Sequence, residues 1–324
     1  MSKTESKTEV PGNIRIGVSS CLLGKKVRFD GGHKRSRFVT DALSDYFELA
    51  PYCPEVAIGM GIPRQPIRLV GDQDNPQAVG VKNPELNVTQ PLRDYAHKVA
   101  GTIDGLCGFI FKKDSPSCGM TRVKVYNSKG MPERAGTGLF AREIMQADPL
   151  LPVEEEGRLN DAGLCDSFIT RVYVYARWKA LLKSGVSLSG LMEFHASHKF
   201  LVMAHSNVVY GQLGRMLSGP GSENLHETAA SYIGLLMEAL KRPATRKQHT
   251  NVLQHLLGYL KKDLESAYRA DLAGTIDAYR RGDYPLVVPV RLLQHYFSIH
   301  LHPYISRQVY LDPYPESLQL RNIL

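Results

Sequence analysis

The sequence predicts two domains of different class, an α/β domain over 12–158 and an all-α domain over 159–324. The length of 324 residues is typical of two domains, and 43% hydrophobic with 22% charged residues excludes wholesale disorder. From residue 14 to about 125, short apolar runs alternate with helical patterns, which predicts a small parallel or mixed sheet with helices. Beyond about 160 the pattern is almost wholly helical.

The elements of the first domain follow from local periodicity. Strands are expected over 14–19, 108–111 and 122–126, and helices over 40–50 and 91–103. Asp148-Pro149 and the acidic run 154–156 interrupt this pattern, so we expect a linker or boundary near 150–165. The polar and charged residues 1–11 predict a disordered tail.

The second domain contains five stretches with helical periodicity, separated by glycine and proline. They cover 168–183, 187–217, 224–240, 246–273 and 289–302. No run of 18 uncharged apolar residues occurs, which argues against a membrane span. The first ten residues lack the apolar region of a secretion signal, and the cysteine count of five is odd. We therefore expect a reducing cytoplasm, where cysteines serve as metal ligands or catalytic thiols.

Three of the five cysteines share a context. Cys21 follows the first expected strand, Cys53 follows the expected helix over 40–50, and Cys118 follows the strand over 108–111. Each lies in a loop rich in proline, glycine or serine, and loops at strand carboxyl ends converge on one crevice. Three thiolates there suit an iron–sulfur cluster, or a zinc ion with an open position. Cys107 and Cys165 are interpreted as structural.

The wider motifs around these cysteines resemble the thiouracil desulfidase family. The matching residues are Ser20-Cys21-Leu22-Leu23-Gly24, Val27-Arg28-Phe29-Asp30-Gly31, Cys53-Pro54-Glu55-Val56, Gly61-Ile62-Pro63-Arg64 and Lys112-Lys113-Asp114-Ser115-Pro116-Ser117-Cys118-Gly119. The second half, with His198-Lys199-Phe200-Leu201-Val202-Met203-Ala204-His205-Ser206, Tyr210 and Leu213-Gly214, resembles a helical domain often fused to that family. The whole chain is thus similar to the two-domain tRNA 4-thiouridine desulfidases.

The resemblance implies an activity and a cofactor. It implies a [4Fe-4S] cluster held by Cys21, Cys53 and Cys118, with one iron lacking a protein ligand. It also implies conversion of 4-thiouridine in tRNA to uridine, by non-redox hydrolytic C–S cleavage that releases sulfide. The open iron is a Lewis acid that polarises the C–S bond of the pyrimidine thione. The departing sulfur and the ring nitrogen require a general acid or base.

Two residues are candidates for this proton chemistry. Glu55, two residues after Cys53, is expected to activate water, although its carboxylate can instead bond loop amides or pair with Arg64. Glu48 is the alternative base. Ser115 is expected to relay a proton or hold the pyrimidine, and the alternative is a serine that only shapes its turn.

Four further polar residues fall within the matched motifs. Ser117 is placed to hydrogen-bond a cluster sulfide. Arg28 or Arg64 can hold a phosphate or carbonyl oxygen of the substrate, or form a structural ion pair with Asp30. These two interpretations of the arginines stay open.

The helical domain is expected to bind tRNA. Between 160 and 311 the sequence has 17 Lys and Arg against 11 Asp and Glu, a net of +6 within a total of +8. His198, Lys199, His205 and Arg215 are the candidate RNA contacts, and the alternative for the histidines is a place in the core.

Two other functions compete with this prediction. The first is a desulfidase of free thiouracil-type bases, which the one-domain relatives support and the added basic domain opposes. The second is a non-catalytic iron–sulfur sensor that binds nucleic acid, which predicts four protein ligands or redox-linked binding.

Overall fold

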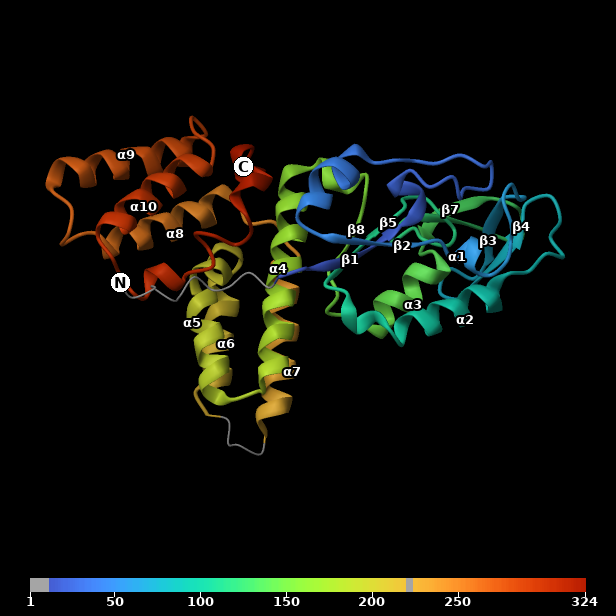
Figure 1. Cartoon of the computed structure of the whole chain (residues 1–324), viewed down its shortest axis with the longest axis horizontal. Coiled ribbons are helices and arrows are strands. Elements are labelled where there is room, and N and C mark those ends of the chain that lie inside the picture. The colour runs from blue at the N-terminus through green and yellow to red at the C-terminus, as the bar shows by residue number, and fades with distance from the viewer. Residues whose placement is uncertain (1–11, 220–223) are drawn as a thin grey trace. The chain divides into compact units, whose positions relative to one another are not determined.

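The computed structural model describes residues 12–219 and 224–324, and the predicted disordered tail over 1–11 lies outside them. The described chain forms two compact units, residues 12–160 and residues 161–324 (Figure 1). The first unit contains two small sheets with helices, and the second is all helical. The predicted fold classes are therefore confirmed.

The first sheet is parallel throughout, and its core is made by alternate residues of its central strands. Its order is β2-β1-β5-β8, from β2 (Glu48–Tyr52), β1 (Arg15–Ser19), β5 (Gly108–Phe111) and β8 (Val153–Glu155). Ile16 and Val18 are fully buried, as is Phe109 on the neighbouring strand. A Cβ atom at Gly17 would lie 2.3 Å from the Phe109 ring, so only glycine fits between these strands.

The second sheet was predicted only at residues 122–126. Its order is β4-β3-β6-β7, from β4 (Pro76–Gly80), β3 (Ile67–Gly71), β6 (Val123–Tyr126) and β7 (Pro132–Gly136). β3 and β6 are parallel, whereas the outer pairs are antiparallel. Alternation buries one face of β3 and β6 against helices and leaves the other face more exposed.

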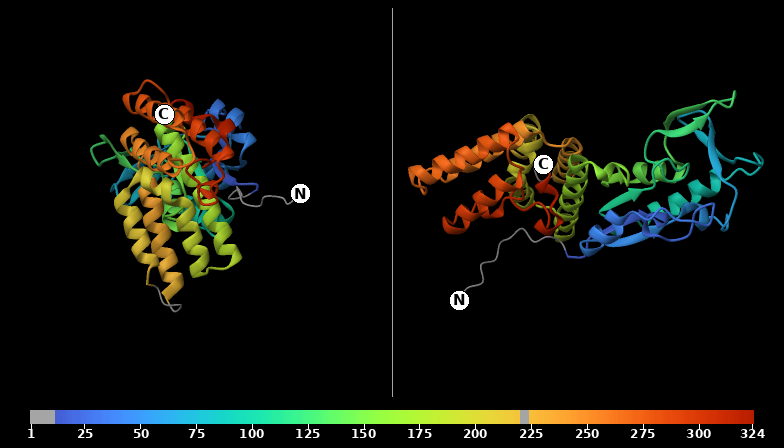
Figure 2. Two further views of the ribbon diagram at one scale, coloured as in Figure 1. Left: turned by 90° about the vertical axis from the view of Figure 1, so that its left-hand side faces the viewer. Right: turned by 90° about the horizontal axis from the view of Figure 1, so that it is seen from above.

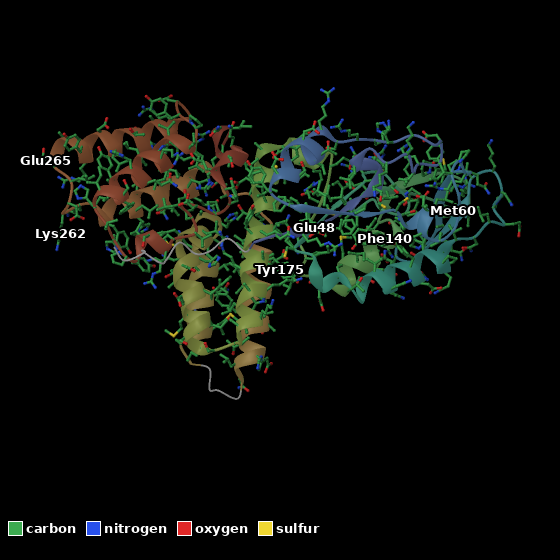
Figure 3. All side chains as sticks on the ribbon, viewed as in Figure 1. Glu48, Met60, Phe140, Tyr175, Lys262 and Glu265 are labelled. Atoms are coloured by element: carbon green, nitrogen blue, oxygen red, sulfur yellow. The ribbon has the colours of Figure 1, made fainter. Side chains whose placement is uncertain are left out.

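Helices complete the first unit. They are α1 (Pro54–Ala57), α2 (Thr89–Ala100) and α3 (Leu139–Ala147), and α2 packs against α3. Phe140 of α3, labelled in Figure 3, joins an aromatic cluster with rings of the parallel sheet. Its ring lies 5.9 Å from that of Phe109 and 6.4 Å from those of Tyr52 and Phe111, centroid to centroid. This cluster supports the strand ends that carry the site.

One sequence expectation for this unit is wrong. The helix expected over 40–50 is two short turns, Phe38–Ala42 and Leu43–Asp45, followed by β2. Parallel pairing of Leu49 with Ile16 outweighs the helical periodicity. The two compact units divide between residues 160 and 161, inside the range expected for a linker or boundary, and the edge strand β8 in that range pairs with β5.

The second unit consists of seven helices in its described part. They are α4 (Ala162–Ser184), α5 (Leu188–His205), α6 (Asn207–Leu217), α7 (Leu225–Leu240), α8 (Arg246–Tyr259), α9 (Ser266–Arg281) and α10 (Val287–Ile299). α5 lies beside α6, and α8 beside α9 (Figure 2). The helix expected over 187–217 breaks at Ser206, whose hydroxyl accepts the Val209 N–H and caps α6. The helix expected over 246–273 breaks between α8 and α9.

Helix α4 forms the centre of the second unit, because its residues 165–178 are buried on all sides. Trp178 is 2% exposed and packs on Phe194 and Tyr232. Asp166 accepts a hydrogen bond from Tyr314 of the C-terminal segment. No helix within 12–219 or 224–324 has the length and apolar character needed to cross a membrane.

Candidate metal centre

Three cysteines meet at one edge of the parallel sheet. Cys21 lies in the 3-10 turn Ser20–Leu23 after β1, Cys53 directly follows β2, and Cys118 lies in the loop after β5. β2, β1 and β5 are adjacent parallel strands, so their carboxyl ends share an edge. All three side chains line a single cavity of about 340 Å³. We call them the cavity cysteines.

Local sequence fixes the backbone at each cavity cysteine. The turn that carries Cys21 ends at Gly24, whose φ of 83° is a left-handed conformation that favours glycine. Cys53 precedes Pro54, which occupies the first position of α1. The loop of Cys118 is closed by the Ser115 hydroxyl, which accepts the N–H of Ser117 at 3.3 Å and of Cys118 at 3.1 Å.

Burial controls the protonation of the three thiols. It raises the pKa of Cys21 to about 11, against a smaller lowering by the Lys112 ammonium. The pKa values of Cys53 and Cys118 are also raised by burial. A hydrogen bond from Ser19 opposes the rise in the pKa of Cys118. The other two cavity cysteines raise that pKa further. The three sulfurs are thus close enough to interact, and iron binding would have to displace their protons.

The sulfur donors that line the cavity are of the type that holds iron–sulfur clusters. In an iron–sulfur cluster each thiolate binds a different iron, so the ligand sulfurs are spaced by the cluster itself. Lys112 and Arg28 also line the cavity, and their charges suit an assembly of three thiolates. The donor set therefore fits an iron–sulfur cluster with three cysteine ligands.

Glu55 is held in place on both of its oxygens. Arg64 donates from Nε and Nη2 to Oε2 at 2.9 and 2.8 Å, and Ser117 donates from Oγ to Oε1 at 2.8 Å. Arg64 also bonds the carbonyls of Gly61 and Val27 at 3.0 Å each. The ion pair is shielded, because the side chains of Arg64 and Glu55 are 5% and 15% exposed. Glu55 lines the cavity with its orientation fixed.

These bonds settle the partners of the two arginines. Arg64 pairs with Glu55 rather than with Asp30, and Arg28 lies 3.5 Å from Asp30. Asp30 is exposed, and the Gly32 N–H holds the pKa of its carboxyl below the usual value. Arg28 lines the cavity, with its guanidinium 5.3 Å from the Phe29 ring centroid. Of these residues, Arg28 and Arg64 face the cavity and Asp30 does not.

The two serines have different positions. Ser115 lines the cavity, while Ser117 is fully buried and does not. The hydroxyl of Ser117 donates to Glu55, so it positions that carboxylate instead of meeting the cluster as expected. Glu48, the alternative base, lies at the opposite end of β2 and pairs with Arg15 at 3.0 Å. It does not line the cavity.

The acidic run at 154–156 contributes support that the sequence analysis missed. Glu155 is 2% exposed and accepts the N–H groups of Met120 and Thr121, just after Cys118. Burial raises the pKa of its carboxyl. Glu156 bonds the Lys112 ammonium and accepts the Lys113 N–H at 2.7 Å. The sequence contained one signal for this strand. Two apolar residues directly precede the acidic run, a pattern that also occurs in short edge strands.

Two of the candidate RNA contacts in the helical unit are buried. His198 is 1% exposed, and its Nδ1 lies 2.7 Å from the Phe194 carbonyl oxygen. His205 is 9% exposed, with Nδ1 2.7 Å from the Arg242 carbonyl oxygen. Both side chains belong to the core, which corrects the expectation that they face RNA. Lys199 is half-buried and Arg215 is exposed.

The basic charge is shared by both units. Residues 161–324 have 18 Lys and Arg against 13 Asp and Glu, a net of +5, while residues 12–160 carry +3. Many basic side chains of the helical unit are paired, among them Lys241 with Glu238, and Arg280 and Arg281 with Asp277. The helical half therefore carries the larger part of the net charge, as expected, and ion pairs neutralise some of its basic side chains.

Comparisons with known proteins match each half of the chain. Residues 16–156 match the family model described as 2-thiouracil desulfurase, and residues 199–315 match a family described as a protein of unknown function, DUF1722. Uncharacterized protein YbgA of Escherichia coli is 31% identical over 48% of this chain and 94% of its own length. Uncharacterized protein YbbK of Bacillus subtilis is 31% identical over 45% of this chain and 98% of its own length. A solved structure, the [4Fe-4S]-dependent thiouracil desulfidase TudS, is 31% identical, with a TM-score of 0.39, over 48% of this chain and 99% of that one.

Proposed function

Because this chain belongs to the 2-thiouracil desulfurase family, it is a desulfidase, and we propose that it converts 4-thiouridine in tRNA to uridine. The reaction is a non-redox hydrolytic cleavage of the C–S bond that releases sulfide. The observation that carries this proposal is the meeting of the cavity cysteines, Glu55 and Ser115 around one cavity of about 340 Å³. We place the enzyme in the cytoplasm, where its thiols stay reduced.

The cavity cysteines are proposed to hold a [4Fe-4S] cluster with one iron that lacks a protein ligand. Support comes from the cysteine positions, since Cys107 and Cys165 do not line the cavity. When bound, the cluster supplies a Lewis-acidic iron that accepts the soft sulfur of a pyrimidine thione. The ammonium of Lys112, fixed by Glu156, balances the thiolate charge beside Cys21.

Glu55 is proposed to take a proton from the attacking water. A carboxylate has about four acceptor positions, and here Arg64 uses two on Oε2 while Ser117 uses one on Oε1. One position on Oε1 remains for a water molecule in the cavity. Arg64 and Ser117 thus orient Glu55 without exhausting its capacity to accept.

Ser115 is proposed to donate a hydrogen bond to the substrate. Its oxygen already accepts the N–H groups of Ser117 and Cys118, so both lone pairs are in use. Its hydroxyl hydrogen is left for a cavity ligand, such as the ring nitrogen or the carbonyl oxygen of the pyrimidine. Arg28, also on the cavity wall, is proposed to face the same substrate.

The tRNA substrate is supported by the second unit. Residues 199–315 lie outside the desulfurase match and carry exposed basic side chains. Lys199 forms no ion pair with any residue in the described part of the chain, and its Nζ lies 5.2 Å from the Phe200 ring and 6.0 Å from the Tyr210 ring. A cation among aromatic rings suits phosphate and unstacked bases. Lys199 and Arg215 are the proposed RNA contacts.

A free thiouracil-type base is the second candidate substrate. The cavity is of small-ligand size, and residues of the first unit alone line it. Competition between free 4-thiouracil and thiolated tRNA, at matched concentrations of thione, separates the two. Preference for tRNA supports the leading proposal, and equal or greater turnover of the free base contradicts it.

The decisive experiment is anaerobic reconstitution of the full chain with iron and sulfide. Purified thiolated tRNA should lose 4-thiouridine and gain uridine, with one sulfide released for each conversion. The iron–sulfur spectrum should change when the substrate is added. Intact 4-thiouridine after incubation with cluster-loaded protein would contradict the proposal and leave a non-catalytic sensor as the better explanation.

A further inference from the structure

A second groove adjoins the cavity of the cavity cysteines. Its volume is about 320 Å³, and both hollows are lined by Ile67, Asp114 and Pro116. Three cations of the second sheet, Arg68, Lys124 and Arg134, also line this groove. We call it the basic groove.

Strand register places the three cations of the basic groove in one row. Lys124 of β6 pairs directly with Arg134 of β7. On the other side of β6, Leu69 of β3 pairs with Val125, which sets Arg68 beside Lys124. Like charges opposite each other on one face of a sheet are destabilising. The sheet tolerates this row across three strands, which indicates a role other than stability.

The protein supplies little negative charge to offset this row. Arg134 lies 3.5 Å from Asp114, and both side chains are half exposed. Arg68 and Lys124 form no ion pair within residues 12–219 and 224–324, although Lys124 is exposed and Arg68 half-buried. The Nε of Arg68 is buried and has no hydrogen-bond partner among the described residues. Buried donors without partners are uncommon in proteins, and this one shows that the described residues leave the Arg68 guanidinium incompletely compensated.

An arginine and a tyrosine that line the groove indicate which class of anion it binds. The guanidinium of Arg68 lies 5.1 Å from the Tyr126 ring centroid, and Tyr126 also lines the groove. Arginine binds phosphate through paired N–H donors, and a half-buried tyrosine ring at the groove wall can stack on an unpaired base. Phosphate beside an aromatic ring is the repeating chemistry of a single-stranded nucleic acid.

We infer that the basic groove binds phosphate groups of the RNA strand that carries the thiolated nucleotide, a role that rests on the proposed function. The thiolated base enters the cavity of the cavity cysteines. Its sugar passes the shared residues Asp114 and Pro116, and a phosphate lies against Arg68 and Lys124. The α/β domain alone then distinguishes a polynucleotide from a free base, without a contribution from the helical domain.

The test uses the reconstituted full chain with the double variant Arg68→Gln, Lys124→Gln. Lys98→Gln is the matched control, because Lys98 is an exposed lysine of α2 outside the groove. Three substrates are compared: 4-thiouracil, 4-thiouridine monophosphate and a single-stranded oligoribonucleotide with one internal 4-thiouridine. Binding of the labelled oligonucleotide is measured by fluorescence anisotropy over a series of salt concentrations.

The double variant should bind the oligonucleotide about tenfold more weakly, with a salt slope lower by about 0.7, the contribution of the one phosphate that both side chains contact. Its kcat/KM for the oligonucleotide should fall by a similar factor, while that for 4-thiouracil stays within about twofold of wild type. Its melting temperature should equal or exceed that of wild type, since like-charge repulsion is removed. If kcat/KM also falls for the monophosphate, the groove binds the nucleotide's own phosphate. If kcat/KM falls for the oligonucleotide alone, the groove binds a flanking phosphate.

Three results would overturn the inference. In the first, the double variant binds the oligonucleotide as tightly as the Lys98→Gln control does. In the second, the salt slope of the double variant is unchanged. In the third, its kcat/KM falls equally for 4-thiouracil and the oligonucleotide. Failure of the proposed function looks different. If wild type leaves 4-thiouridine intact but the double variant alone loses oligonucleotide binding, the basic groove stands and the proposed conversion of 4-thiouridine fails.

Discussion

Acidification should unfold the helical unit because its core holds neutral histidines. Burial lowers the pKa of His198 from 6.5 to about 3, aided by the nearby charge of Arg177. Burial, with the charge of Arg321, also lowers the pKa of His249 well below its usual value. Both side chains are less than one-tenth exposed. Below pH 6.5 the unfolded chain binds protons that the folded chain does not, so stability falls as the pH falls.

The magnitude follows from counting protons. Each such histidine lowers the free energy of unfolding by about 1.4 kcal/mol per pH unit below 6.5. At pH 5, 1.5 units lower, His198 and His249 together remove about 4 kcal/mol. Typical domains have only about 5–15 kcal/mol of stability, so a substantial part of the margin is lost before carboxylates begin to titrate. His205, whose pKa is also lowered by burial, adds to this loss.

The chain contains its own reporter for this experiment. Trp178 is the single tryptophan, and it is buried in the helical unit. Urea unfolding followed by its fluorescence at pH 7.5, 6.0, 5.5 and 5.0 gives the stability of that unit. His249→Gln should reduce the pH slope by about 1.4 kcal/mol per unit. His226→Gln changes an exposed histidine and should leave the slope unaltered. Stability that is flat between pH 7.5 and 5 would refute the reasoning.

Three further predictions concern the site. Alanine at each cavity cysteine should abolish retention of iron and sulfide after reconstitution, whereas Cys165→Ala, outside the cavity, should retain both. Glu55→Gln should keep the iron content, measured by metal analysis, but lower turnover by about 100-fold, because an amide is a poor proton acceptor. Gly138→Ala should cost about 1–3 kcal/mol in chemical unfolding and lower the iron content. Its added Cβ would lie 2.6 Å from the Ser117 backbone.

The controls for these variants come from the same chain. Gly105→Ala adds a Cβ that meets no atom within 4 Å, so its unfolding free energy and iron content should match wild type. Full iron content in all three cavity-cysteine variants would remove the basis of the proposed cluster. Wild-type turnover in Glu55→Gln would assign the proton transfer to another group.

The meeting of the cysteines was predictable because it depends on topology more than on exact element boundaries. The sequence analysis placed Cys53 after a helix, yet the structure places it after β2. In both descriptions the residue follows an element that leads to the sheet edge. The proline, glycine and serine content of the three loops was enough to identify them. The fold class was predicted for a similar reason, since periodicity changes clearly near residue 160.

Long-range pairing could not be predicted from local pattern. β8 contains Glu154 and Glu155, which are unfavourable in strands, and it is stabilised by pairing with β5 and by bonds from the Cys118 loop. β7 is exposed at four of its five residues and shows no apolar alternation. The burial of His198 and His205 was equally hidden, because histidine is common both in cores and on surfaces.

The pairing order of the parallel sheet also sets when the site can form during protein synthesis. The cavity cysteines all precede residue 120, but Glu156, which fixes Lys112, belongs to the last segment of the first unit. Its edge strand β8 lies beside β5, more than 40 residues earlier in the chain. During synthesis the cavity therefore lacks the Glu156 contact until residue 156 has emerged from the ribosome, shortly before the residues that begin α4.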